Sequence, residues 1–175
     1  MAMVTRFAAA VLLGGALAAG VSAAELSGEP GSVERAQAIA AAFAARFGTI
    51  GPQLAANLDQ LYTDDVRFRD PITAVSGLPA LQRYLTHFGE QANGARFVIT
   101  DTLVQPGNAA VFWTMVMPAK EGEAGAAIGG VSHLRVRDRV YEERDYFDLG
   151  EVYERVPVVG WFTGLVKSRL APEQE

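Results

Sequence analysis

The segment 140–149, Val-Tyr-Glu-Glu-Arg-Asp-Tyr-Phe-Asp-Leu, alternates as a β-strand does and carries charge on both of its faces. Successive side chains of a strand point to opposite sides. One face of this strand therefore holds four residues: Tyr141, Glu143, Asp145 and Phe147. An unpaired charge in a packed core costs several kcal/mol. Carboxyl groups flanked by aromatic rings on one strand face therefore indicate the wall of a pocket rather than a plain core.

Helical patterns come first along the chain. Ser32 can cap a helix that runs to Phe47, because the apolar residues between them keep helical spacing. Pro52 suits the first position of a second helix, which we expect to end before residues 63–65. A third helix is expected to open at Gly77 and to bury one apolar face. The N-terminal half is therefore predicted to be mainly helical.

Strand patterns account for the rest of the domain. A short strand is expected over 66–70, between the second and third helices, and longer strands over 96–104 and 109–117. A hairpin of 126–137 and 140–148 follows. This order predicts an α+β domain whose N-terminal helices pack on one face of a curved antiparallel sheet. Curvature of the sheet can leave a cavity between the two layers.

The length of the hairpin loop decides which side chains face each other across its strands. A two-residue loop at 138–139 places Ser132 opposite Asp145, whereas a three-residue loop places Val131 there. The first register is favoured because it directs apolar side chains such as Leu134 toward the interior. It is expected even though neither loop residue is glycine, which tight hairpins usually contain.

Three carboxyl groups are the candidate catalytic residues. On an apolar strand face, Asp145 should have a raised pKa and could move a proton near neutral pH; the alternative is a buried acid bonded to Ser132 or to an arginine. Asp70, before a proline at a strand end, is either a second acid at the pocket rim or the cap of the following turn. Glu143 shares the face of Asp145 and either raises the pKa of the pair or binds an arginine.

Aromatic and small polar side chains are expected to complete the pocket. The candidates for its wall are Phe68, Trp113, Met115, Ser132 and Phe147. The same pattern also suits residues of a closed core, since both environments are apolar. If the pocket is open, its apolar wall predicts a small hydrophobic molecule as the ligand.

Composition excludes several other classes of site. The formal net charge of -5, with no basic stripe, argues against a nucleic-acid partner. The chain has no cysteine and only two histidines, His87 and His133, so we expect neither a disulfide nor a thiolate or histidine-rich metal site. No glycine-rich phosphate loop is present either, so we expect no cofactor. The 175 residues suffice for one domain with its own core.

The two ends of the chain have compositions of their own. Residues 1–23 read as a secretory signal peptide, followed by a linker over 24–31, and predict export to a periplasm or the extracellular space; an uncleaved membrane anchor is the alternative. Residues 150–175 are expected to form a C-terminal helical extension. Its apolar side chains favour packing on the domain at 32–149, and the alternative is peripheral contact with a membrane.

Two segments are similar to those of known enzymes. Residues 62–71, Tyr-Thr-Asp-Asp-Val-Arg-Phe-Arg-Asp-Pro, resemble the segment of ketosteroid isomerases whose last aspartate is the catalytic base. Residues 144–148, Arg-Asp-Tyr-Phe-Asp, resemble the closing strand of limonene-epoxide hydrolases, whose first aspartate is catalytic. The positions concerned are Asp70 and Asp145. Over residues 32–148 the chain resembles the SnoaL-like group of the nuclear-transport-factor-2-like superfamily.

The resemblance implies a fold and a range of activities. It implies a cone-shaped, strongly bent sheet wrapped around helices, with a hydrophobic pocket inside and a homodimer formed through the outer face of the sheet. The pocket would bind a polyketide-, steroid- or terpenoid-like molecule, with isomerase, cyclase or epoxide-hydrolase chemistry. The alternatives are a non-catalytic ligand-binding protein or a protein-interaction module, because this fold serves both. One departure is that strand 112–117 has no charge, where the epoxide hydrolases carry an arginine and an aspartate.

Overall fold

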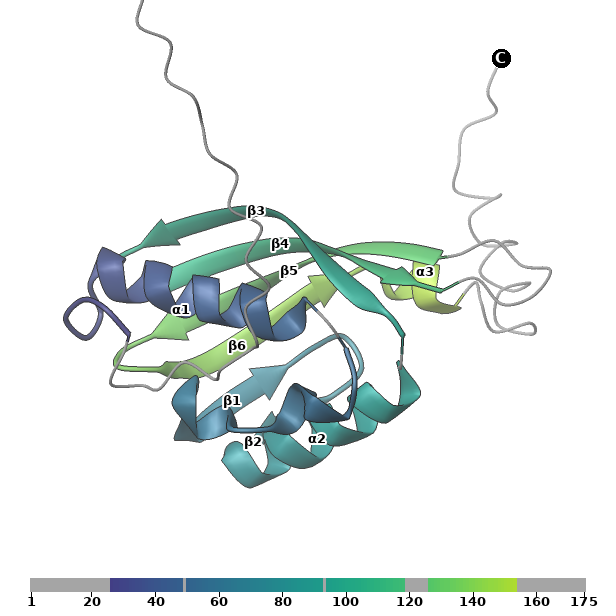
Figure 1. Cartoon of the computed structure of the whole chain (residues 1–175), viewed down its shortest axis with the longest axis horizontal. Helices are drawn as coiled ribbons and strands as arrows, with labels where there is room; N and C mark the ends of the chain where they lie inside the picture. Colours follow the sequence, from purple (N-terminus) through teal and green to yellow (C-terminus); the bar gives the residue numbers. More distant parts are fainter. Residues whose placement is uncertain (1–25, 49, 93, 119–125, 154–175) are drawn as a thin grey trace, which may run out of the picture.

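The computed structural model of the chain describes residues 26–48, 50–92, 94–118 and 126–153 (Figure 1). The expected signal peptide and nearly all of the C-terminal extension lie outside the described residues. The described part of that extension forms one short helix, α3 (Leu149–Tyr153). Among the described residues, no helix has the length and apolar character needed to cross a membrane.

One curved sheet of six strands forms a layer of the domain, in the order β2-β1-β6-β5-β4-β3. The strands are β1 (Tyr62–Arg69), β2 (Ala74–Ser76), β3 (Arg96–Gln105), β4 (Asn108–Met117), β5 (Ala126–Val136) and β6 (Val140–Phe147). All neighbours are antiparallel except β1 and β6, which are parallel, so the sheet is mixed and not antiparallel throughout as the sequence suggested. The pair escapes sequence analysis because no hairpin joins these two strands.

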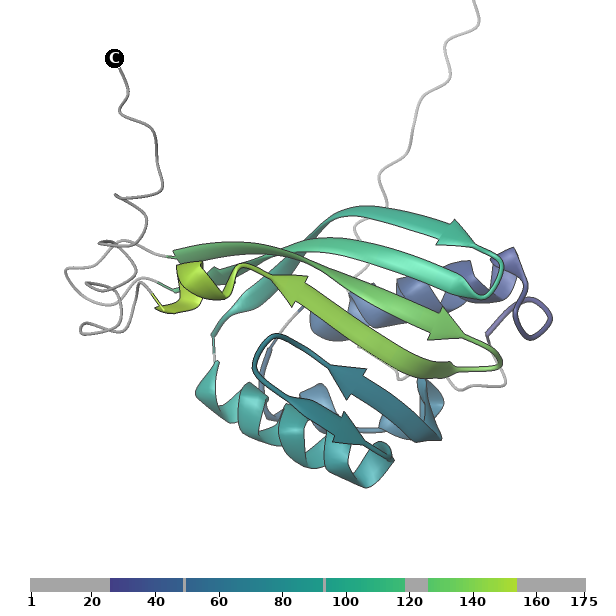
Figure 2. The same cartoon turned by 180° about the vertical axis from the view of Figure 1, so that it is seen from behind.

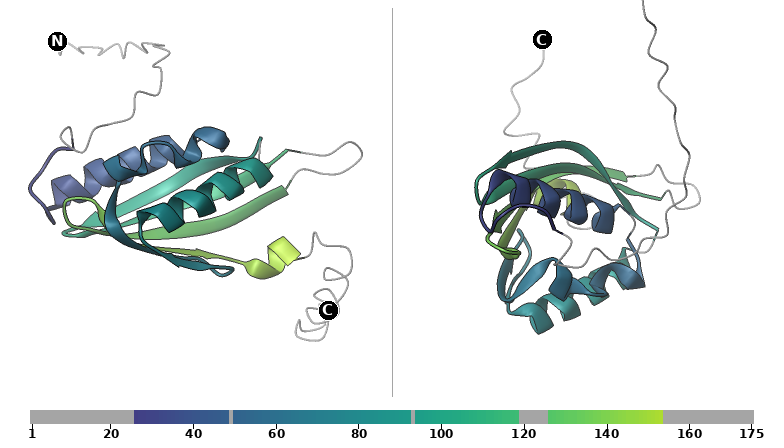
Figure 3. Two further views of the ribbon diagram at one scale, coloured as in Figure 1. Left: turned by 90° about the horizontal axis from the view of Figure 1, so that it is seen from below. Right: turned by 60° about the vertical axis from the view of Figure 1, so that its left-hand side comes forward.

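Two α-helices pack against the concave face of the sheet, so the domain is α+β as predicted. α1 (Val33–Phe47) follows its expected cap, since the Ser32 side chain accepts a hydrogen bond from the Arg35 amide at 3.1 Å. α2 (Leu78–Gln91) lies beside β1 and β2, and the long strands curve around α1 (Figure 3). From behind, the long strands present their outer face with no described helix across it (Figure 2).

The expected second helix is replaced by two short 3-10 helices, η2 (Pro52–Ala55) and η3 (Leu58–Gln60). The chain is extended at Ala56 and left-handed at Asn57, with φ of 50°, and this interrupts the helix. Asparagine adopts the left-handed region more easily than most residues. The Arg46 guanidinium donates hydrogen bonds to backbone carbonyls at this break, including that of Asn57 at 3.1 Å.

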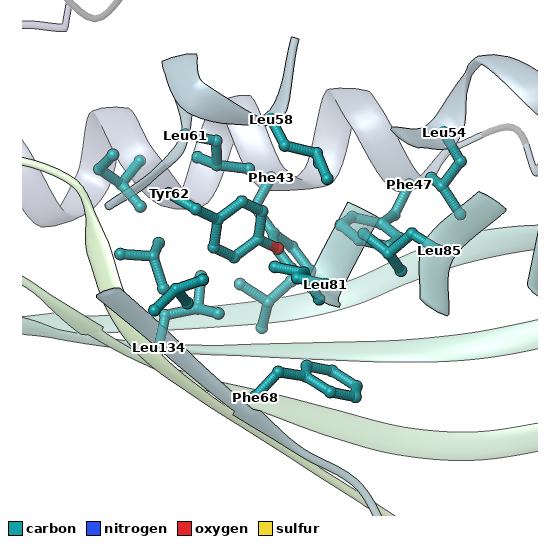
Figure 4. Packing of buried hydrophobic residues seen from close by; sticks show 14 of the residues in the cluster. Phe43, Phe47, Leu54, Leu58, Leu61, Tyr62, Phe68, Leu81, Leu85 and Leu134 are labelled. Carbon is teal, nitrogen blue, oxygen red and sulfur yellow. The ribbon is translucent and has the colours of Figure 1, made fainter. Parts of the chain in front are cut away.

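A single apolar core joins the helices to the sheet (Figure 4). Its largest members come from both helices, from the 3-10 segments and from three strands: Phe43, Phe47, Leu54, Leu58, Leu61, Tyr62, Phe68, Leu81, Leu85, Val111 and Leu134. Leu54, Leu58 and Leu61 are buried although the expected second helix is broken. The hydroxyl of Tyr62 therefore lies within the core and requires a hydrogen-bond partner.

The β5–β6 hairpin has the predicted register, reached in a different way. Ser132 lies opposite Asp145, as expected from a two-residue loop. The loop instead has three residues, because Val136 pairs with Val140. A register shift at Tyr141 then absorbs the extra residue, as a β-bulge does, and restores the pairing.

The bulge also moves the side chain of Tyr141, which we predicted to lie on the same strand face as Glu143 and Asp145. Tyr141 stacks against the exposed Arg135 and Arg137, with the Arg137 guanidinium carbon 4.2 Å from the ring centroid. Glu143 and Asp145 keep their predicted inward orientation because they lie beyond the shift.

Candidate functional site

A cavity of about 170 Å³ lies between the helices and the concave face of the sheet. Its wall includes all eight residues predicted for the site: Phe68, Asp70, Trp113, Met115, Ser132, Glu143, Asp145 and Phe147. Helices α1 and α2 add the phenyl rings of Phe43, Phe47 and Phe88 and the phenol of Tyr84. The cavity is therefore the expected apolar pocket, with three carboxyl groups in its wall.

Trp113 forms the central wall of the cavity. Its indole N–H donates to Ser132 Oγ at 3.0 Å, and the Phe97 ring meets it edge-on with centroids 4.7 Å apart. Gly130 lies directly opposite Trp113 on β5, and a Cβ atom there would come within 2.3 Å of the indole. Glycine is therefore required at this position if the indole is to lie flat across the neighbouring strand.

Glu143 is the most deeply buried of the three acids, with 2% of its surface exposed. The Tyr62 hydroxyl donates a hydrogen bond to Glu143 Oε2 at 2.6 Å. Burial, and next the charge of Asp145, raise the pKa of Glu143 well above its ordinary value. The hydrogen-bond partner of Glu143 is therefore a tyrosine rather than the arginine considered from the sequence.

Asp145 lies two residues further along β6 on the same face. Burial raises its pKa from 3.8 to about 7, against the opposing effects of hydrogen bonding to Ser132 and Glu143. The negative charge of Asp70 raises it further. The residue as a whole is partly exposed, but its Oδ1 atom is shielded from solvent and has no hydrogen-bond partner among the described residues. Asp145 thus lines the cavity as a carboxyl group whose pKa lies near neutral pH.

Asp70 caps its turn, as one of the two sequence interpretations predicted, and it also lines the cavity. Its Oδ1 accepts hydrogen bonds from the amides of Ile72 at 2.7 Å and Thr73 at 2.5 Å. Its Oδ2 accepts from the hydroxyl of Tyr84 on α2. Burial, and next this hydrogen bond, raise the pKa of Tyr84. Both carboxylate oxygens of Asp70 are therefore engaged.

Sequence analysis missed the two tyrosines that contact the acids. Tyr62 begins β1, and Tyr84 lies in α2. A buried tyrosine needs a partner for its hydroxyl, which is a usable signal. The identity of the partner depends on the parallel pairing of β1 with β6, which the sequence does not disclose.

Among residues 26–48, 50–92, 94–118 and 126–153, no group of three or more potential metal ligands comes together. The four ion pairs found in this part of the chain all involve other residues than the three acids of the cavity. In the part of the chain that the structure describes, the polar groups of the cavity are therefore hydrogen-bond donors and acceptors within an apolar wall.

Three solved structures of similar fold share little sequence with this chain. A proposed isomerase of the SnoaL-like family from Agrobacterium tumefaciens is 15% identical, with a TM-score of 0.54 over 65% of this chain and 97% of that one. A proposed SnoaL-like polyketide cyclase from a Jannaschia species is 18% identical, with a TM-score of 0.51 over 57% and 75%. A protein of ketosteroid-isomerase-like fold from Catenulispora acidiphila, in complex with trimethylamine, is 19% identical, with a TM-score of 0.56 over 66% and 88%.

The family assignment comes from the sequence match. No curated protein matches this chain. A family model described as a SnoaL-like domain matches residues 40–142, more than half of the chain. The matched range contains Asp70 and ends one residue before Glu143. The chain therefore belongs to the SnoaL-like domain family.

Proposed function

We propose that this protein binds a small lipophilic molecule in its cavity and catalyses a proton transfer within that molecule. Asp145 is the base in this proposal, and Glu143 is the neutral acid beside it. The observation that carries the proposal is the position of Asp145, which lines an apolar cavity beside a second acid, Glu143, on the same face of β6. The family supports it in general terms, since the similar structures include a proposed isomerase and a proposed polyketide cyclase.

The proton chemistry follows from the two different environments on β6. A general base works best when its pKa lies near the working pH, and the pKa of Asp145 is about 7. Burial raises the pKa of Glu143 well above its ordinary value, and the hydrogen bond from Tyr62 fixes its position. Two carboxyl groups whose pKa values are separated by their surroundings can serve as base and acid. Removal of a proton beside a carbonyl group starts an isomerisation or a ring closure, and the same base could activate water on an epoxide.

We assign Asp70 to positioning rather than to proton transfer. Both of its oxygens already accept hydrogen bonds, two from backbone amides and one from Tyr84. A proton taken up by Asp70 would weaken these contacts. Its role is then to hold the Tyr84 ring in the cavity wall.

Hydrogen–deuterium exchange of a ketone tests the base directly. The probe is 2-tetralone in D2O, whose protons next to the carbonyl exchange when a base removes them and whose loss is followed by proton NMR. We expect the wild-type protein to accelerate exchange and Asp145→Asn to lose about 100-fold or more of that acceleration. Asp64→Asn is the matched control, because it changes an exposed aspartate of β1 in the same way. Binding of 2-tetralone with equal exchange by wild type and Asp145→Asn would support a non-catalytic binding protein instead.

Export and self-association are separate parts of the proposal. Cleavage after residue 23 would release a chain that begins at Ala24, or at Glu25 if the site lies one residue later. The intact mass of the protein recovered from a periplasmic fraction tests this, and a full-length mass there would favour an anchor. For a homodimer we propose the outer face of the sheet, where Leu103 is 58% exposed and Tyr146 45%. Light scattering of wild type and Leu103→Asp tests the homodimer.

A further inference from the structure

Apart from the phenol of Tyr84, the ionisable side chains in the cavity wall are all carboxylic acids. They are Asp70, Glu143 and Asp145, and no lysine, arginine or histidine of the described residues lines the cavity. The other polar groups in the wall are the hydroxyls of Tyr84 and Ser132 and the indole N–H of Trp113. An anionic ligand would therefore meet like charges and no counter-ion there.

The hydrogen bonds leave one oxygen of these acids without a partner. Asp70 accepts hydrogen bonds from two amides and a hydroxyl, and Glu143 accepts one from Tyr62. Asp145 has one oxygen with no partner among the described residues. An ionised carboxylate shielded from water is costly unless a positive charge or further donors accompany it. A ligand that brings a positive charge to Asp145 would remove that cost.

The remainder of the wall is suited to hold the rest of such a ligand. Aromatic rings contribute eight of the lining side chains: Phe43, Phe47, Phe68, Tyr84, Phe88, Phe97, Trp113 and Phe147. The faces of aromatic rings attract cations, tryptophan most strongly, and the attraction grows when water is excluded. Trp113 lies near the acids because Ser132, the partner of its N–H, is directly opposite Asp145. One ligand can thus place a positive charge beside Asp145 and its apolar groups against the aromatic rings.

We propose that the ligand of this cavity is a lipophilic amine or ammonium compound whose positive nitrogen lies next to Asp145. This inference rests on the proposed function, since it names the chemical class of the molecule that the cavity binds. The volume of about 170 Å³ suits a ligand somewhat larger than benzene, which an apolar cavity of about 150 Å³ holds.

A pair of ligands of the same shape and different charge tests the proposal. The probes are phenyltrimethylammonium and its neutral isostere tert-butylbenzene, titrated into the wild-type protein at pH 8 by calorimetry. We expect the ammonium compound to bind at least about tenfold more tightly. In Asp145→Asn we expect its affinity to fall about tenfold or more, with the affinity for tert-butylbenzene unchanged. Asp64→Asn should bind both probes as the wild type does.

The other outcomes separate this inference from the proposed function. If tert-butylbenzene binds as tightly as the ammonium compound, or more tightly, the charge preference is wrong while the apolar binding site stands. If Asp145→Asn prefers the ammonium compound to tert-butylbenzene as strongly as the wild type does, the assignment of the nitrogen to Asp145 is wrong. If neither probe binds, both the inference and the proposed binding function are overturned.

Discussion

Asp145→Asn should raise the stability of the protein at neutral pH and flatten its dependence on pH. The folded chain keeps a proton on Asp145 up to about pH 7, whereas the unfolded chain releases it near pH 3.8. Below about pH 3.8 Asp145 carries a proton in both the folded and the unfolded chain, so it does not affect the free energy of unfolding there. Between about pH 3.8 and about pH 7 the folded state binds more protons, so the free energy of unfolding falls as the pH rises. Above about pH 7 the loss is complete.

The pKa shift sets the size of the effect. One pKa unit corresponds to about 1.4 kcal/mol, so the shift from 3.8 to about 7 is worth at most about 4 kcal/mol. Water that enters the cavity would solvate the carboxylate and lower this cost. The expected gain in the variant is therefore about 2–4 kcal/mol at pH 8, because an asparagine does not ionise.

Urea unfolding followed by circular dichroism measures this free energy at several pH values from about 4.5 to 8.5. The quantity of interest is the difference between Asp145→Asn and wild type, which includes the effect of Asp145 on Glu143. It should grow with pH, while the difference for Asp64→Asn should stay within about 0.5 kcal/mol of a constant. A difference for Asp145→Asn that does not change with pH would refute the assignment of a raised pKa to this group.

Two further substitutions test the packing around the acids. Gly130→Ala should destabilise the fold by about 1–3 kcal/mol and shift tryptophan fluorescence, because the new methyl group overlaps the Trp113 ring. Gly129→Ala is its control, since nothing lies within 4 Å of a Cβ atom there, and equal effects of the two changes would contradict the packing. Tyr62→Phe should cost about 1–3 kcal/mol in urea unfolding, since it leaves the buried Glu143 without its donor; an unchanged stability would show that this hydrogen bond contributes nothing.

The elements that the sequence predicts well are those with a local pattern. The helix after Ser32 and the inward orientation of Glu143 and Asp145 depend on residues a few positions apart. Alternation with a period of two survives the unexpected bulge because the extra residue, Tyr141, lies outside the segment that carries the acids. The candidate wall residues follow from the same alternation.

The features that escaped sequence analysis depend on contacts distant in the chain. The parallel pairing of β1 with β6 joins segments about 80 residues apart, and it brings Tyr62 to Glu143. The broken second helix depends on Arg46, whose guanidinium satisfies carbonyl groups that a continuous helix would have paired internally. Apolar spacing alone cannot separate a regular helix from two 3-10 turns that bury the same leucines.

The pairing of Trp113 with Gly130 makes the shape of the cavity depend on two residues together. The largest and the smallest side chain face each other across β4 and β5, so their combined volume, rather than either residue, fills this part of the wall. A relative with a smaller aromatic residue on one strand and a larger residue on the other would keep the sheet packed and reshape the cavity. Since Glu143 and Asp145 belong to β6, such an exchange leaves the acids in place. The shape of the cavity can therefore change while the positions of the acids stay fixed.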